Sequence, residues 1–305
     1  MARNSRDRSV TQRVMNRGRE LGLSRNDALV AYAMDRLLYR LGRSSQAGEF
    51  FLKGGLLVAN LVDAPHRFTR DIDLLRRHGP TDLDELRQRF RTIVAVAADD
   101  GIEFDPSGVR ATLSTREVDG YDGVRVRLEA TIGDSTIDVQ VDIGFGDAVV
   151  PPAARLRLTS FLGGDPAAEV WAYDVGPVLA EKIETFVTKF PLVEHRLKDL
   201  LDVVVLSRTR AFEGPALLDS IRATFERRGA IPNVALLDDI NAVLRGRRWS
   251  QSWAVMCREK AVVQPLDLTS AVVAFDSFVR PVLLSMATGL PVGVWTPGSR
   301  WKAPS

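Results

Sequence analysis

The feature that most constrains this chain is a pair of aspartates, Asp71 and Asp73, separated by one isoleucine. Alternate side chains of an extended strand share a face, so both carboxylates point the same way while Ile72 and Leu74 face the core. Two carboxylates held this close repel each other unless a cation lies between them. Oxygen ligands of this kind suit Mg²⁺, which usually completes its coordination with substrate phosphates. The pair therefore predicts a magnesium site at a strand.

A glycine pair, Gly54 and Gly55, follows Lys53 upstream of the two aspartates. Because a turn without side chains lets backbone N–H groups approach phosphate oxygens, it fits a phosphate-binding segment. Each feature alone is usually uninformative, since an isolated Asp-x-Asp is commonly a solvated strand end and Gly-Gly commonly only a turn. Arg67 and Thr69 stand just before the first aspartate, and this combination is far more specific. Together the features predict a site for a nucleoside triphosphate and a metal.

The segment from Lys53 to Leu74 resembles the first motif of the AbiEii/AbiGii nucleotidyltransferase toxins, a group that includes the mycobacterial MenT toxins. That motif is Gly-Gly, a short helix and then Arg-[Phe/Tyr]-[Ser/Thr]-x-Asp-[aliphatic]-Asp, and the chain carries it without a gap. The resemblance implies an α+β fold, with a polymerase-β-type nucleotidyltransferase core on a mixed sheet and a mainly helical C-terminal half. It also implies two Mg²⁺ ions held at the aspartates. The implied nucleotide ligands in this segment are Lys53, Gly54, Gly55, Arg67 and Thr69.

A second acidic stretch, with Asp138, Gln140 and Asp142 alternating with apolar residues, predicts another strand. In isolation this pattern fits an antiparallel strand with a polar outer face. Beside a metal-binding pair, a third acid on a neighbouring strand would complete the coordination of one metal and help to deprotonate an attacking hydroxyl. Asp142 is the better candidate, because the stretch from Asp142 to Asp147 resembles the family's Asp-[Ile/Val]-Gly-Phe-Gly-Asp element.

Lys182 lies on a predicted helix whose apolar stripe includes Leu179, Ile183 and Phe186. A lysine in such a place is commonly solvated or paired with an acid at i,i+4. The sequence Ala-Glu-Lys ending at Lys182 is similar to a family element, and this similarity implies that the lysine reaches the triphosphate. A positive charge there would stabilise the pyrophosphate leaving group.

A fourth motif, Arg-Leu-Lys-Asp-Leu-Leu-Asp, begins at Arg196 on a further predicted helix. Its charges fit ordinary helical ion pairs, Arg196 with Asp199 and Lys198 with Asp202, each worth about 0.2–0.5 kcal/mol. The motif and its distance from Lys182 are also similar to the family signature Arg-x-[Lys/Arg]-Asp-[aromatic or aliphatic]-x-Asp. This resemblance implies nucleotide contacts from Arg196 and Lys198, a functional Asp199, and a weaker claim for Asp202.

The order of elements predicts two domains, an α+β domain with N-terminal helices over 1–174 and a helical domain over 175–305. The family resemblance of the motifs at Lys182 and Arg196 implies that the helical domain completes the active site. The four motifs fall within roughly residues 36–206, and the last hundred residues carry none. The elements expected in the first domain are helices over 26–42, 55–63 and 82–98, and strands ending at 52 and over 68–75, 108–114, 123–132 and 135–145.

Composition agrees with a cytoplasmic enzyme. The 305 residues are 45% hydrophobic, enough for one large domain or two moderate ones. A single cysteine, Cys257, allows no internal disulfide, which is typical of a reducing compartment. The N-terminus is basic without the apolar core of a signal peptide, and we expect no membrane span. The net charge of +2 does not indicate a nucleic-acid binder. Arginines are frequent in the first twenty residues, however, and they form either a solvated face or a contact with phosphates.

The expected reaction is in-line attack by an acceptor hydroxyl on the α-phosphate of a nucleoside triphosphate, which releases pyrophosphate between two metal ions. Asp71, Asp73, Asp142, Lys182 and Asp199 are the expected catalytic residues. By resemblance the acceptor is RNA, with a tRNA 3′ end foremost, and the protein is a toxin with a separately encoded antitoxin. Two other classes stay open: transfer of the nucleotide to Ser, Thr or Tyr of a protein, and a non-catalytic nucleotide-binding module.

Overall fold

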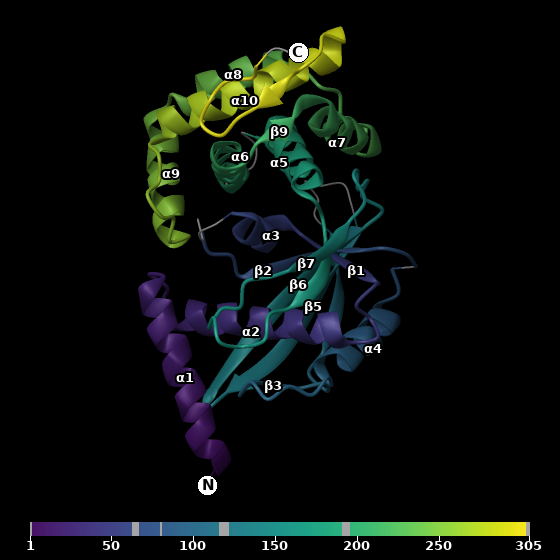
Figure 1. The fold of residues 1–305 in the computed structure, drawn as a ribbon, viewed down its shortest axis with the longest axis vertical. Coiled ribbons are helices and arrows are strands. Elements are labelled where there is room, and N and C mark those ends of the chain that lie inside the picture. The colour runs from purple at the N-terminus through teal and green to yellow at the C-terminus, as the bar shows by residue number, and fades with distance from the viewer. Residues whose placement is uncertain (1, 63–66, 80, 116–121, 191–195, 303–305) are drawn as a thin grey trace. The chain divides into compact units, whose positions relative to one another are not determined.

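The computed structural model describes residues 2–62, 67–79, 81–115, 122–190 and 196–302. These form two compact units (Figure 1). The sheet unit comprises Met1–Asn60, Phe68–Gly146 and Ala154–Ala172. The helical unit comprises Leu61–Arg67, Asp147–Ala153 and Tyr173–Ser305.

The sheet unit is built on a mixed eight-stranded sheet with the order β3-β5-β6-β2-β1-β8-β7, in which β4 also pairs with β5. Strand β2 runs parallel to β6 and β1 parallel to β8, whereas the other pairs are antiparallel. The predicted fold class, a mixed-sheet α+β core followed by helices, is therefore confirmed. The strands are β1 Phe50–Lys53, β2 Asp71–Arg76, β3 Glu103–Phe104, β4 Arg110–Thr115, β5 Asp122–Ile132, β6 Ser135–Phe145, β7 Ala154–Arg157 and β8 Glu169–Ala172.

The period-two alternation of β6 gives the sheet its buried face. Ile137, Val139 and Val141 are each at most 3% exposed, while the residues between them carry polar side chains. Helix α2 (Arg25–Arg43) packs against the sheet. Helices α1 (Ala2–Glu20), α3 (Gly54–Leu61) and α4 (Leu83–Val94) complete this unit. Ser24 caps α2 by accepting a hydrogen bond from the N–H of Asp27, which satisfies one of the free donors of the first turn.

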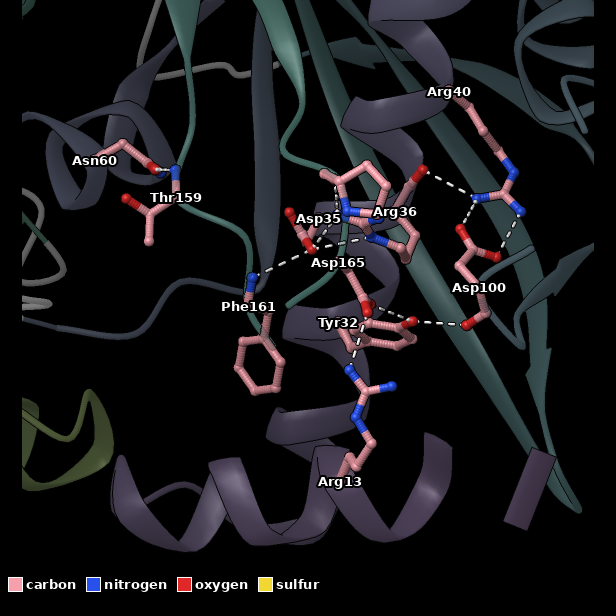
Figure 2. Close-up of polar contacts among 11 residues, drawn as sticks. Arg13, Tyr32, Asp35, Arg36, Arg40, Asn60, Asp100, Thr159, Phe161 and Asp165 are labelled. Atoms are coloured by element: carbon pink, nitrogen blue, oxygen red, sulfur yellow. Dashed lines mark hydrogen bonds and ion pairs between the residues drawn. The ribbon is translucent and has the colours of Figure 1, made fainter. Parts of the chain in front are cut away.

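Helix α2 also anchors the segment between β7 and β8 (Figure 2). Asp35 accepts a 3.2 Å hydrogen bond from the N–H of Phe161 and a 2.7 Å bond from Arg36. Burial raises the pKa of Asp35, and its ion pair with Arg36 opposes that shift. Arg13, on α1, lies 2.9 Å from Asp165 in the same segment. The segment is therefore held by side chains from two helices.

The basic N-terminal segment is helix α1 (Ala2–Glu20), and it packs against the rest of the sheet unit. Val10 and Val14 are 5% and 0% exposed. Gly18 lies so close to Ala28 of α2 that a Cβ at this glycine would collide with the alanine methyl group. The segment is therefore a helix with one side buried in the sheet unit, and its exposed side carries arginines such as Arg13 and Arg19.

The helical unit contains α5 to α10 and a short antiparallel pair, β9 with β10. Phe186 of α5 stacks on Phe190 and meets Phe275 of α10 edge-on, with ring centroids 5.0 Å apart in both pairs. Trp249 and Trp295 are 8% and 3% exposed, which favours packing over base stacking for these side chains. The elements are α5 Val175–Lys189, α6 Leu197–Thr209, β9 Phe212–Glu213, α7 Gly214–Arg227, α8 Ala235–Leu244, α9 Arg247–Glu259, α10 Leu268–Thr288 and β10 Val294–Trp295.

Helix α10 is long and apolar enough to cross a membrane by length and composition, which the sequence pattern did not lead us to expect. Its charged residues are satisfied within the helical unit, since Arg280 binds Asp276 at 2.8 Å and Asp238 of α8 at 2.8 Å. Phe275 and Phe278 on the same helix are at most 2% exposed. These contacts favour the interpretation of α10 as the core helix of this unit.

Candidate active site

The sheet unit brings Asp71, Asp73 and Asp142 together. Asp73 on β2 lies directly opposite Asp142 on the parallel strand β6, and Asp71 lies two residues earlier on the same face. Each carboxylate offers one oxygen, and these three oxygens lie within 4.8 Å of one another. Asp138, the weaker alternative, is exposed and pairs in register with Glu129 of β5. The third acid of the cluster is therefore Asp142.

The oxygen-rich donor set of these three residues fits Mg²⁺. Hard divalent cations take carboxylate oxygens and complete their coordination with water and substrate phosphates. Asp71 and Asp73 are partly exposed, whereas Asp142 is 9% exposed. The open side of the cluster is thus formed by the β2 pair, on which a substrate phosphate would have access.

Position 54 requires a glycine, because the backbone there lies very close to the side chain of Asp73. The φ of Gly54, +67°, lies in the left-handed region, and a Cβ at this position would collide with the Asp73 carboxylate. Helix α3 starts at this glycine, so the positive end of the helix dipole lies at this turn. Lys53 pairs in register with Asp73 on the neighbouring strand β1. This arrangement is compatible with the predicted phosphate-binding turn.

Thr69 is bound to an acid of the cluster. Its hydroxyl donates a 2.5 Å hydrogen bond to Oδ1 of Asp71, and the residue is 7% exposed. The threonine was predicted as a nucleotide ligand from the motif. In the structure its hydroxyl binds the first aspartate, so its contact is with a residue of the acid cluster.

Arg125 is a site residue that the sequence motifs did not single out. It lies opposite Asp142 across the β5–β6 ladder. Its guanidinium donates two hydrogen bonds to that carboxylate, from Nε to Oδ1 at 2.8 Å and from Nη2 to Oδ2 at 3.0 Å. The side-chain amide of Gln140 donates a 3.2 Å bond to Oδ2 of the same acid. The hydrogen bonds to Asp142 raise the pKa of Arg125, and the charges of Asp71 and Asp73 raise it further.

The helical unit holds a second cluster of charges. Nζ of Lys182 on α5 lies 2.7 Å from Oδ1 of Asp199 and 2.9 Å from Oδ2 of Asp202, both on α6. Arg67 donates two hydrogen bonds to Asp202, from Nε to Oδ1 at 2.7 Å and from Nη2 to Oδ2 at 2.8 Å. Nη1 of Arg196 lies 3.5 Å from Oδ2 of Asp199. The structure thus unites one residue of the first motif with the third and fourth motifs. Lys198, also predicted as a nucleotide ligand, is half-buried on α6.

The charges in this second cluster alternate, and together the five side chains carry one net positive charge from three cations and two anions. Burial alone would lower the pKa of Lys182, but the charges of Asp199 and Asp202 outweigh it and the pKa is raised. The lysine is therefore protonated at neutral pH. Asp202 is bound to Lys182 and Arg67, so the simple i,i+4 pairing of Asp202 with Lys198 does not describe it.

Comparison with known proteins decides the family. A family model described as the AbiEii nucleotidyl transferase toxin of type IV toxin–antitoxin systems matches residues 36–279. The chain belongs to this family. It is therefore a nucleotidyltransferase of a type IV toxin–antitoxin family, and the family predicted from the four motifs is confirmed.

Solved structures of similar proteins share the fold. The nucleotidyltransferase toxin MenT4 of Mycobacterium tuberculosis H37Rv matches with a TM-score of 0.58 and 18% identity, over 92% of this chain and 89% of that chain. JHP933 from Helicobacter pylori matches with a TM-score of 0.50 and 14% identity, over 88% of this chain and 97% of that chain. A search among curated proteins gives no match.

Proposed function

We propose that this nucleotidyltransferase is Mg²⁺-dependent and transfers a nucleoside monophosphate from a nucleoside triphosphate to an RNA acceptor. The observation that carries the proposal is the cluster of Asp71, Asp73 and Asp142, whose oxygens lie within 4.8 Å of one another. Asp142 is paired with Arg125, but three carboxylates in such a space still repel one another, and a cation bound among them would relieve this repulsion. The proposal covers two ions, as two-metal transfer sites use.

The proposal gives each residue of the sheet-unit site a task in the reaction. Asp71 and Asp73 would hold the metal, and Thr69 keeps Asp71 oriented through its hydrogen bond. When bound, Mg²⁺ supplies charge for the attacking and leaving oxygens. Asp142 would complete the coordination of one metal and thereby help to deprotonate the acceptor hydroxyl. The first turn of α3 at Gly54 and Gly55 offers N–H groups to phosphate oxygens.

Lys182 is proposed to serve the triphosphate. Lys182 lies with Arg67 and Arg196 around Asp199 and Asp202 in a largely buried setting, where charges interact more strongly than in water. Asp199 and Asp202 hold its ammonium group, so in this proposal they position the lysine. Arg196 and Lys198 are proposed as further nucleotide contacts from α6. We also propose that the helical domain completes the active site in this way.

The acceptor is proposed to be RNA, with a tRNA 3′ end as the first candidate, and the toxin is proposed to act in the cytoplasm against a separately encoded antitoxin. Membership of a type IV toxin–antitoxin family supports the partnership with an antitoxin. The RNA acceptor rests on the resemblance of the motifs to the family. A hydroxyl of Ser, Thr or Tyr on a protein is the alternative acceptor for the same chemistry.

A labelling experiment tests the function. The protein is incubated with Mg²⁺ and each of the four α-³²P-labelled nucleoside triphosphates, once with total RNA, once with purified tRNA and once with RNase-treated protein extract. Label in tRNA supports the proposal, and label in protein would replace it with protein nucleotidylylation. Asp73→Asn serves as the inactive control and Asp138→Asn as the matched active control, because Asp138 is an exposed acid outside the cluster. Label in neither pool, from the wild type with any nucleotide, would refute both.

A further inference from the structure

Arg125 places a fixed positive charge inside the acid cluster. Its strand, β5, pairs with β6 along an antiparallel ladder that runs from Val124 opposite Ile143 to Ile132 opposite Ser135. The guanidinium therefore comes from a rigid element directly beside Asp142, and the two side chains are 30% and 11% exposed. A two-point arginine–carboxylate pair of this kind is directional and among the stronger ion pairs.

This charge opposes the binding of a metal ion. The three acids carry three negative charges, and Arg125 cancels one of them before any cation arrives. A divalent ion among Asp71, Asp73 and Asp142 would lie near the guanidinium, and two like charges that close repel each other. The arginine thus stabilises the cluster without metal and weakens the attraction that the cluster exerts on a metal.

A nucleoside triphosphate reverses this balance. It brings several negative charges and further oxygen ligands, and Mg²⁺ in proteins is commonly held by one or two carboxylates together with substrate phosphates. When the triphosphate is present, its phosphates supply the negative charge that Arg125 cancels at the cluster, and the metal ion is held by carboxylates and phosphates together.

We propose that Arg125 stands in for the metal's charge at the acid cluster, so that Mg²⁺ binds weakly alone and is taken up together with the nucleoside triphosphate. The inference rests on the proposed metal-dependent function of the same acids. It assigns Arg125 a positioning and gating role that no motif indicated.

The test measures metal binding directly, with Mn²⁺ as the probe, by isothermal titration calorimetry in the absence of nucleotide. The variant Arg125→Gln removes the charge and keeps hydrogen-bonding capacity. We expect it to bind Mn²⁺ about tenfold more tightly than the wild type, which corresponds to about 1.4 kcal/mol. With a saturating non-hydrolysable triphosphate the difference between the two proteins is expected to shrink to less than threefold.

Arg127→Gln is the matched control. Arg127 lies two residues along the same strand and on the same face, is exposed, and pairs in register with Gln140. The substitution changes the net charge of the protein equally, so Mn²⁺ affinity within twofold of the wild type shows that the effect is local to the cluster. Arg125→Lys keeps a positive charge without the planar fork, and we expect an affinity within threefold of the wild type.

The outcomes separate this inference from the proposed function. If Arg125→Gln binds Mn²⁺ no more tightly than the wild type, or Arg125→Lys binds it as tightly as we expect of Arg125→Gln, the charge argument is overturned and Arg125 only supports Asp142. If the wild type binds Mn²⁺ tightly without nucleotide through Asp71 and Asp73, the inference fails while the metal site stands. If no protein binds Mn²⁺ with or without triphosphate, the metal-dependent function fails, and this inference with it.

Discussion

Arg67 and Asp202 form a buried two-point ion pair although 135 positions separate them in the chain. The side chains are 2% and 0% exposed. Asp202 also binds Lys182, so the arginine of the first motif supports the acid that holds the lysine of the third. The predicted nucleotide ligand Arg67 is thus placed to act through Asp202, by fixing the cluster around Lys182.

Breaking this pair should unfold the protein more easily. We expect Arg67→Ala to lower the free energy of unfolding by about 3–5 kcal/mol, because it leaves the carboxylate of Asp202 in a buried site without its two-point partner. Urea denaturation followed by circular dichroism measures the change. Arg87→Ala is the control, since Arg87 and its partner Asp84 form an exposed i,i+3 pair, whose removal should cost no more than about 0.5 kcal/mol.

The acids of the sheet unit should behave in the opposite way. Asp71→Asn and Asp73→Asn are each expected to abolish nucleotide transfer, while thermal stability without metal stays equal or rises, because each removes repulsion between carboxylates. Label incorporation and thermal melts in EDTA give the two readouts. Transfer above one tenth of the wild-type rate in either variant would contradict the assignment, and a collapse of both melts would show a structural role.

Lys182 should affect both turnover and stability. Lys182→Met removes the cation between Asp199 and Asp202, and we expect a decrease of about 10²–10³ in kcat, the range for one preorganised donor. The raised pKa of Lys182 gives the pH dependence its sign. Its stabilising contribution is complete below the unfolded pKa of about 10.4 and is lost only as pH rises through the higher folded pKa.

Activity and stability measured from pH 6 to pH 9 should therefore show no transition that Lys182→Met removes. Lys182→Arg tests geometry, since it keeps the charge but changes the shape of the donor. A Lys182→Met variant with lower melting temperature and unchanged kcat would reduce the lysine to a structural ion pair.

Short-range sequence patterns predicted the arrangement of the acid cluster better than that of the charge cluster around Lys182. The spacing of Asp71 and Asp73 fixed their shared face, and the turn at Gly133 and Asp134 fixes the β5–β6 register, so Arg125 could have been placed opposite Asp142 from the sequence. By contrast, the Arg67–Asp202 pair depends on tertiary packing between distant segments, which no local period encodes.

Elements were missed where the local signal is weak. Strands β3, β7 and β8 have four residues or fewer, and no motif marks their ends as the Gly-Gly pair marks the end of the equally short β1. The basic N-terminal segment was described by its charge, which conceals the packing of Val10 and Val14 that ties α1 into the sheet unit. Gly54 was found through its motif, but its need for a positive φ beside Asp73 is visible only in the structure.

The packing of α1 decides how a phosphate contact by its arginines, the alternative that the sequence left open, has to be tested. Removing residues 1–19 would take away the buried Val10 and Val14, so weaker RNA binding after truncation would not separate charge from folding. Arg13 is also unsuitable, because it binds Asp165 at 2.9 Å. Arg17 is 41% exposed in its side chain and pairs within the helix with the exposed Glu20, so its substitution together with the exposed Arg19 leaves the buried face of the helix intact.

We expect the double variant Arg17→Gln/Arg19→Gln to bind RNA more weakly and with a smaller salt dependence, because a protein that neutralises fewer phosphates releases fewer counterions. For tRNA, which has both paired and unpaired segments, the slope of log K against log salt should fall by about 0.7–0.9 for each phosphate that is no longer neutralised. Fluorescence anisotropy with labelled tRNA at several salt concentrations measures it, and Mn²⁺ with triphosphate binding provides the control for the acid cluster. An unchanged slope with unchanged affinity would move the acceptor surface away from α1, because the side chains that neutralise phosphates must then lie elsewhere on the chain.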